Sequence, residues 1–205
     1  MTLPAPPDLP EVSPDRIPAA GLLPLIALVG LPGVGKSTIG RRLSVALDCA
    51  FVDTDDWIEA RTGRTIPIIF EQLGEARFRE LEAEALSQIE HLHPKVVVAT
   101  GGGIVTSAAS REFLSRRAFT VYLHAPRPTL LSRVTKNKKR PLFRSGDVAG
   151  VLARMDEERS PIYRAIAKLI CDLEGRTLND TVAYLAAALN TVDSVNGDRS
   201  EEGLR

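Results

Sequence analysis

The sequence lacks several features that would assign it to a particular class of protein. No run of 18 apolar residues occurs in its 205 residues, which excludes a long membrane-spanning helix. The net charge is zero, so no overall field favours nucleic acid or a membrane surface. Only two cysteines occur, Cys49 and Cys171, both in apolar surroundings, which favours buried reduced thiols over a disulfide. We expect a cytoplasmic monomer of one domain, or at most two small ones, without nucleic-acid or membrane partners.

The two ends of the chain have compositions that do not favour a packed core. Residues 1–20 hold six prolines and three acidic residues but only one basic residue. Neither a secretory signal nor a mitochondrial transit peptide has this composition. The sequence therefore predicts a disordered or extended leader over residues 1–22, a folded domain over 23–191 and a disordered polar tail over 192–205.

One stretch, Leu25 to Leu43, combines an apolar run, a glycine-rich loop and a helical pattern. Its loop, Gly30–Ser37, fits the P-loop pattern G-x-x-x-x-G-K-[ST]. In that pattern the backbone N–H groups face a phosphate, Lys36 reaches the β and γ phosphates, and the Ser37 hydroxyl can bind Mg²⁺. The N-terminus of the following helix favours the same anion. A plain glycine-rich turn is the alternative, but the strand–loop–helix context favours nucleotide phosphate binding.

Strands and helices alternate along the rest of the chain. The predicted strands are 25–29, 50–52, 96–99, 120–123 and 168–171. The predicted helices are 38–47, 54–61, 66–73, 75–91, 107–116, 128–134, 150–165 and 179–189. This alternation implies right-handed crossovers and a parallel sheet. The polar, basic segment between the sixth and seventh helices is interpreted as a mobile loop.

Polar residues and glycines follow the predicted strands, where parallel sheets bind their ligands. Asp53 and Asp55 are two residues apart, so on an extended chain their side chains lie on the same face. We expect one of them to lie near Mg²⁺ and the other near a substrate hydroxyl. Helix capping by Asp55 or Asp56 is the alternative. Gly101–Gly103 suit an anion or a hydroxyl-rich ligand, or else form a flexible turn. The strand before them ends without the aspartate of motor ATPases and GTPases, which argues against those classes.

Two charged segments are candidates for binding. The helix over residues 75–91 is dense in charge, which is typical of a solvated face, but Phe78 beside Arg79 indicates an inward turn there. The segment from Arg133 to Arg144 holds five Lys or Arg among its first eight residues. Because it lacks the interleaved aromatic residues that favour single-stranded nucleic acid, we favour a lid whose arginine stabilises a transferring phosphate. The three histidines have no metal-ligand spacing.

Taken together, these segments resemble the shikimate kinase family of P-loop small-molecule kinases. The segments read GLPGVGKST, FVDTD, GRTIPIIFEQLGEARFRELE, ATGGG, KKRPLF and ERSPIYRAIA, and the similarity runs from about Pro24 to Leu189. The resemblance implies a three-layer α/β fold, with a five-stranded parallel sheet flanked by helices and a mobile lid over about 135–150. It also implies transfer of the ATP γ-phosphoryl group to the 3-hydroxyl of shikimate, in aromatic amino-acid biosynthesis.

The resemblance also implies site residues by position. For the nucleotide these are Gly33, Val34, Gly35, Lys36, Ser37, Thr38, Arg133 and Arg140. For shikimate they are Asp55, Arg79, Gly101, Gly102, Gly103 and Arg159, with Glu82 orienting Arg79. Ser37 and Asp53 would hold Mg²⁺, and Lys36, Asp55 and Arg140 would be the catalytic groups. Pro67 and Phe143 are less usual choices in their motifs. Two alternatives stay open: a kinase for another small polyol acid or a nucleotide, and a non-catalytic binding domain of the same fold.

Overall fold

The computed structural model describes residues 25–136 and 147–202, and within this part of the chain five strands form one sheet. The strands are β1 (Leu25–Val29), β2 (Ala50–Asp53), β3 (Val96–Ala99), β4 (Phe119–His124) and β5 (Leu169–Asp172). Their order is β2-β3-β1-β4-β5, and every neighbouring pair is parallel. The predicted five-stranded parallel sheet is therefore confirmed. All five carboxyl ends lie at one edge of this sheet, which is where ligands bind in parallel sheets.

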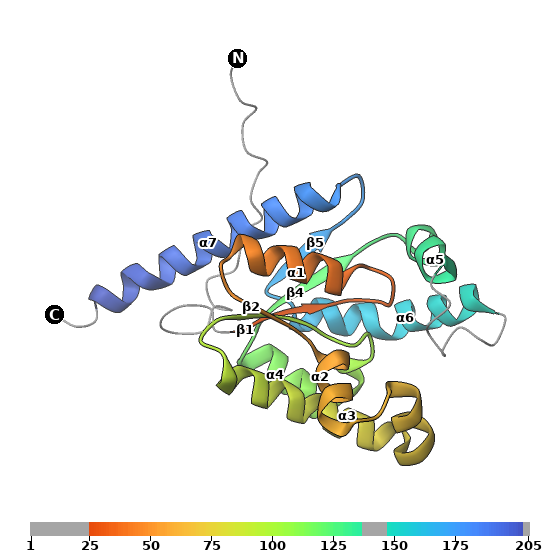
Figure 1. The fold of residues 1–205 in the computed structure, drawn as a ribbon. Helices are drawn as coiled ribbons and strands as arrows, with labels where there is room; N and C mark the ends of the chain where they lie inside the picture. The colour runs from red at the N-terminus through yellow and green to blue at the C-terminus, as the bar shows by residue number, and fades with distance from the viewer. Residues whose placement is uncertain (1–24, 137–146, 203–205) are drawn as a thin grey trace.

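Helices cover both faces of the sheet (Figure 1). The helices are α1 (Lys36–Ala46), α2 (Thr54–Thr62), α3 (Ile66–Leu92), α4 (Ala108–Arg116), α5 (Arg127–Lys136), α6 (Val148–Ile166) and α7 (Leu178–Glu202), with a short 3₁₀ helix η2 (Ile104–Thr106). In Figure 1, α1 and α7 pack together on one side of the sheet, and α3 and α4 lie on the other. Because the central strand β1 is covered on both faces, all of its side chains are buried, which explains its unbroken apolar sequence.

Local sequence signals set the ends of α2 and α3. The Asp53 carboxylate accepts the Asp55 backbone N–H at 3.1 Å and caps α2, so the cap is Asp53 and not Asp55 or Asp56. Gly63 ends α2 in a left-handed conformation, with φ 64°. Gly74, with φ 77° and ψ 171°, breaks α3 into two halves, as the two predicted helices 66–73 and 75–91 require.

The helices beside the predicted lid are longer than the sequence indicates. α5 continues to Lys136, two residues beyond its predicted end, and α6 begins at Val148 because the Asp147 carboxylate accepts the Gly150 N–H at 2.9 Å. The helices thus take residues at both ends of the predicted lid, 135–150. Residues 137–146 of that lid, including Arg140, lie outside the described residues, as does the predicted leader.

The C-terminal helix also differs from its prediction. α7 runs to Glu202, whereas the sequence predicts a helix end at 189 and a polar tail from 192. Leu185, Leu189 and Val192 are buried, so the helix packs beyond its predicted end, and no proline follows to stop it. Within the described residues, no helix is long and apolar enough to cross a membrane. Both cysteines are free thiols; Cys171 is buried as predicted, whereas Cys49 is half-buried.

Candidate active site

The P-loop joins β1 to α1 at the carboxyl edge of the sheet. Gly30, Gly33 and Gly35 have φ of 146°, 84° and 104°, conformations that L side chains rarely adopt. Lys36 is only 6% exposed, and its ammonium group donates to the carbonyl oxygens of Gly30 at 2.6 Å and Leu31 at 3.1 Å. The loop therefore wraps around the lysine and the N-terminus of α1, which is the arrangement that binds a phosphate.

A hydroxyl and a carboxylate meet beside this loop. The Ser37 hydroxyl donates to Asp53 Oδ2 at 2.6 Å, while Oδ1 of the same carboxylate caps α2. Mg²⁺ binds oxygen ligands and usually keeps several waters, so one or two protein ligands and the substrate phosphates are enough to hold it. Within the described residues, no group of three or more His, Cys, Asp or Glu could hold a metal ion. The Ser37–Asp53 pair therefore fits a magnesium site completed by nucleotide phosphates.

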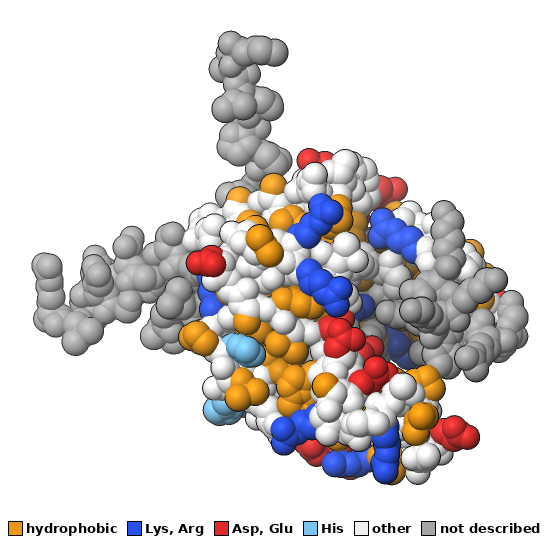
Figure 2. Space-filling view, in the orientation of Figure 1, with side chains coloured by type: hydrophobic (Ala, Val, Ile, Leu, Met, Phe, Trp, Pro, Cys, Tyr) orange, Lys and Arg blue, Asp and Glu red, His pale blue; other side chains and the backbone are white. Residues whose placement is uncertain are grey.

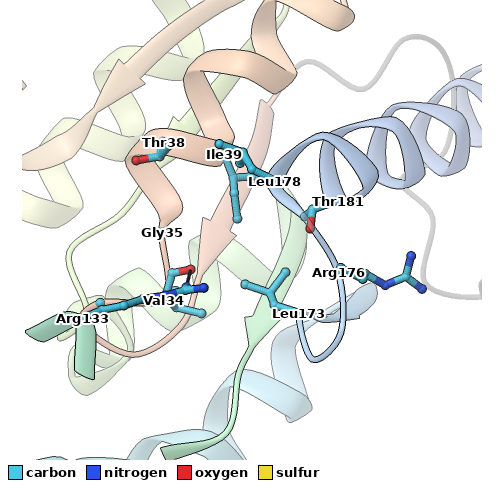
Figure 3. Close-up of a pocket in the computed structure, with 10 residues that line it drawn as sticks. Val34, Gly35, Thr38, Ile39, Arg133, Leu173, Arg176, Leu178 and Thr181 are labelled. Atoms are coloured by element: carbon cyan, nitrogen blue, oxygen red, sulfur yellow. Dashed lines mark hydrogen bonds between the residues drawn. The ribbon is translucent and has the colours of Figure 1, made fainter. Parts of the chain in front are cut away.

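A pocket of about 300 Å³ opens on the outer side of the P-loop (Figure 3). Its lining residues are Gly33, Val34, Gly35, Thr38, Ile39, Arg133, Leu173, Arg176, Leu178 and Thr181. Arg133, on α5, donates from Nη1 to the Val34 carbonyl oxygen at 3.3 Å. Arg176 places its guanidinium 4.4 Å from the centre of the Tyr184 ring. Apolar and cationic groups beside a phosphate loop suit a nucleotide base.

Two arginines from distant helices converge on the glycine loop after β3. Arg79, on α3, lies against Gly103, where an added Cβ would come within 2.6 Å of its Nη1 atom. Arg159, on α6, donates from Nη1 to the Gly102 carbonyl oxygen at 3.0 Å. Its Nε atom is buried and has no hydrogen-bond partner among the described residues. This loop therefore lies between two guanidinium groups, a setting that suits a carboxylate.

Two carboxylates lie beside the same loop. An added Cβ on Gly101 would be 3.1 Å from Asp55 Oδ1 and 2.7 Å from Glu82 Oε1, so both carboxylates lie close to the open side of this glycine. Glu82 is fully buried and accepts Arg79 Nη1 at 2.7 Å. Burial raises the pKa of Glu82 to about 7 against the opposing effect of Arg79, and the Asp55 charge raises it further. Burial alone would lower the pKa of Arg79, but the carboxylates of Glu82 and Glu75 raise it above its ordinary value. The guanidinium therefore stays charged.

Comparisons with known proteins identify the family of the chain. The family model described as shikimate kinase matches residues 32–190, more than half of the chain. The chain belongs to the shikimate kinase family. A shikimate kinase of Psychrobacter arcticus is 43% identical over 148 residues, which are 72% of this chain and 79% of that protein. A solved shikimate kinase from Acinetobacter baumannii, in complex with shikimate, has a TM-score of 0.73 and 38% identity, covering 85% of this chain and 94% of its own.

A more distant structure bears on the alternative of another polyol kinase. A gluconokinase from Sinorhizobium meliloti has a TM-score of 0.52 but only 18% identity, covering 87% of this chain and 99% of its own. This likeness concerns the fold alone. The membership of the chain in the shikimate kinase family rests on the family model and on relatives of much higher identity.

The structure brings most of the predicted site residues of this shikimate kinase family member together. Gly33, Val34, Gly35, Thr38 and Arg133 line one pocket, and Lys36 and Ser37 lie next to them in the P-loop sequence. A second cluster is formed by Asp55, Arg79, Gly101–Gly103 and Arg159. Arg140 lies outside the described residues. Sequence reasoning missed Leu173, Arg176, Leu178 and Thr181, which line the nucleotide-side pocket, and Tyr163, which contacts Gly102. The position of residues 173–178 directly after β5, at the ligand-binding edge, is the signal that could have found the first group.

Proposed function

We propose that the two clusters at the carboxyl edge of the sheet bind MgATP and shikimate side by side. Membership in the family makes the chain a shikimate kinase, which transfers the γ-phosphoryl group of ATP to the 3-hydroxyl of shikimate and releases shikimate 3-phosphate and ADP. One observation supports this assignment of the shikimate-binding residues: Arg79 and Arg159 converge on Gly102–Gly103. This glycine loop lies beside Asp55 and next to the P-loop.

The acceptor cluster matches the chemistry of shikimate. Shikimate is a small carboxylate with three hydroxyl groups, so it needs cationic donors at one end and an acceptor at the other. Arg79 and Arg159 offer planar guanidinium groups for the carboxylate, and the buried Nε of Arg159 supports this role. Asp55, which lies beside Gly101, would accept hydrogen bonds from the hydroxyl groups.

The nucleotide cluster accounts for the other substrate. The backbone of Gly33–Thr38 would bind the phosphates, and Lys36 would exchange its loop carbonyls for the β and γ phosphate oxygens. Ser37 and Asp53 would hold Mg²⁺, which when bound neutralises charge on the phosphates. Arg133 and the pocket beside it would take the adenine.

Phosphoryl transfer asks the protein mainly for positioning and charge neutralisation. In this proposal Lys36 neutralises developing charge, while the Arg79–Arg159 clamp holds shikimate with a hydroxyl directed at the nucleotide. Asp55 orients that hydroxyl and is the candidate acceptor for its proton. Arg140 would approach the phosphates from the lid, a role that rests on the family resemblance alone.

The arginine clamp is tested by titrating the wild type, Arg79→Lys and Arg159→Lys with shikimate in the absence of nucleotide. Lysine keeps the charge but loses the planar pair of donors. A charged hydrogen bond contributes about 1.5–3 kcal/mol, so we expect affinity to fall about tenfold to a hundredfold in both variants. Trp57, on α2 close to Asp55, can report binding by fluorescence. Arg77→Lys is the matched control, because Arg77 lies on the same helix but pairs with the exposed Glu80 and Glu84.

Equal shikimate affinity in all four proteins would contradict the clamp. The choice of substrate is checked separately by coupled release of ADP from the wild type, with shikimate compared against gluconate and AMP. Turnover with gluconate or AMP and none with shikimate would support the alternative kinases instead.

A further inference from the structure

A second donor from α6 reaches the carbonyl that Arg159 holds. Tyr163 lies one helical turn after Arg159, is fully buried, and donates its hydroxyl to the Gly102 carbonyl oxygen at 2.5 Å. The Arg159 Nη1 atom is 3.0 Å from the same oxygen. A carbonyl oxygen has two lone pairs, and both are used here. The roles proposed above use Arg159 but give none to Tyr163.

The ring of Tyr163 is held in place from behind. It stacks on Tyr122 of β4, with ring centres 5.2 Å apart and an angle of 25° between the planes. The Tyr122 hydroxyl lies 3.0 Å from the Ser160 hydroxyl, which in turn donates to Asp156 Oδ1 at 2.5 Å. Burial raises the pKa of Tyr163 despite the nearby charge of Arg159, so the phenol keeps its proton. A protonated phenol in a fixed ring is a donor with a single direction.

This donor fixes the orientation of a glycine peptide. No peptide bond in the described residues is cis, and in a planar trans peptide the C=O and the next N–H point in opposite directions. Because the Gly102 carbonyl points at α6, the Gly103 N–H points away from α6. Gly103 itself lies against the Arg79 guanidinium. Two adjacent glycines would otherwise give this peptide wide conformational freedom.

We infer that Tyr163 is a positioning residue for the acceptor substrate. Its hydroxyl fixes the Gly102–Gly103 peptide and, through the shared carbonyl, the guanidinium of Arg159. The Gly103 N–H and the remaining donors of Arg159 then face the substrate in one geometry. This inference rests on the proposed function, because it takes shikimate as the ligand of that loop.

The test is Tyr163→Phe, which keeps the stacked ring and removes only the hydroxyl. Because one hydrogen bond is lost and Arg159 becomes less well oriented, we expect the Kd and KM for shikimate to rise about five- to tenfold. The KM for MgATP stays within twofold of the wild type.

Tyr122→Phe is the matched control, since it removes the other hydroxyl of the same ring stack without touching Gly102. It leaves the KM for shikimate within twofold. Replacement of Tyr163 by 4-aminophenylalanine restores a donor and lowers the KM again.

Three results would overturn the inference. The first is a shikimate affinity in Tyr163→Phe within twofold of the wild type. The second is an equal loss in Tyr163→Phe and Tyr122→Phe, which would indicate packing of the ring pair. The third is failure of Tyr163→Phe to fold, because the hydroxyl would then serve the fold. A wild-type protein without shikimate-dependent ADP release would instead contradict the proposed function.

Discussion

At the scale of single residues, Glu82 shows how burial changes the chemistry of a side chain. It lies on α3 among charged residues that are mostly exposed, such as Glu80 and Glu84, and in the sequence it differs little from them. In the structure it is fully buried against Arg79, and its pKa rises from its ordinary value of 4.5 to about 7 because its charged form is desolvated. The folded protein therefore holds this proton more tightly than the unfolded chain.

This raised pKa predicts a specific dependence of stability on pH. Between about pH 4.5 and pH 7 the folded state binds a proton at Glu82 that the unfolded state has lost, so this contribution to stability falls as the pH rises. The shift corresponds to about 3 kcal/mol in the free energy of unfolding. When the free energy of unfolding is measured with urea, it should therefore decrease less between pH 5 and pH 8 for Glu82→Gln than for the wild type.

The exposed Glu80 provides the control for this measurement. Glu80 lies on the same helix and pairs with Arg77 at the surface, so Glu80→Gln should keep the wild-type pH dependence. The same decrease in unfolding free energy for Glu82→Gln and the wild type would contradict the raised pKa.

At the scale of elements, the break in α3 directs the second half of the helix to the active site. Gly74 has φ 77° and ψ 171°, a region that is open essentially to glycine alone. No atom lies within 4 Å of an added Cβ there, so a larger residue would be opposed by backbone strain and not by a clash. The residues after the break include Arg79 and Glu82, whose positions depend on where the second half begins.

Gly74→Ala should therefore affect both stability and substrate binding. We expect a loss of about 1–3 kcal/mol in unfolding free energy from the strained backbone, with a several-fold weaker shikimate affinity as Arg79 shifts. Gly63→Ala is the matched control, because Gly63 also has a positive φ, 64°, with open space around it. It should lose about 1–2 kcal/mol while shikimate binding stays unchanged. Parallel losses of affinity in both variants would refute the link between the break and the clamp.

At the scale of the whole molecule, the two substrate positions share one sheet edge but use different segments of the chain. The nucleotide-side pocket is built from the P-loop, α5 and the β5–α7 segment, and the acceptor cluster from α2, α3, α6 and the loop after β3. In the space-filling view, Lys and Arg side chains lie beside acidic ones near the middle of the face that is shown (Figure 2). Substitutions in one cluster should therefore leave the other largely intact.

Arg176→Ala tests this separation. Arg176 lines the nucleotide-side pocket and lies over the Tyr184 ring, so its loss should raise the KM for MgATP about fivefold while the shikimate Kd stays within twofold. Arg117→Ala is the control, since Arg117 makes a similar contact with Phe113 on α4 but lines no nucleotide pocket. An unchanged KM for MgATP in Arg176→Ala would remove this arginine from the nucleotide site.

Much of the architecture follows from patterns that are local in the sequence. The P-loop, the five strands and the break at Gly74 are each specified within a few consecutive residues, because glycine conformations and apolar periodicity act over that distance. Helix ends were harder to predict. The continuation of α7 past Leu189 is accompanied by the burial of Val192, and the start of α6 depends on a cap from Asp147. Such contacts are decided by packing and not by propensity.

The sequence by itself determined the phosphate loop, the parallel α/β class and, through its motifs, the kinase family. The tertiary structure alone decided which distant side chains share a site. It brought Arg176 to the P-loop, Arg159 and Tyr163 to Gly102, and Glu82 into a buried position beside Asp55. The reason is physical: strand order and helix packing set distances between residues that are far apart along the chain, and burial then sets the charge state of the groups enclosed.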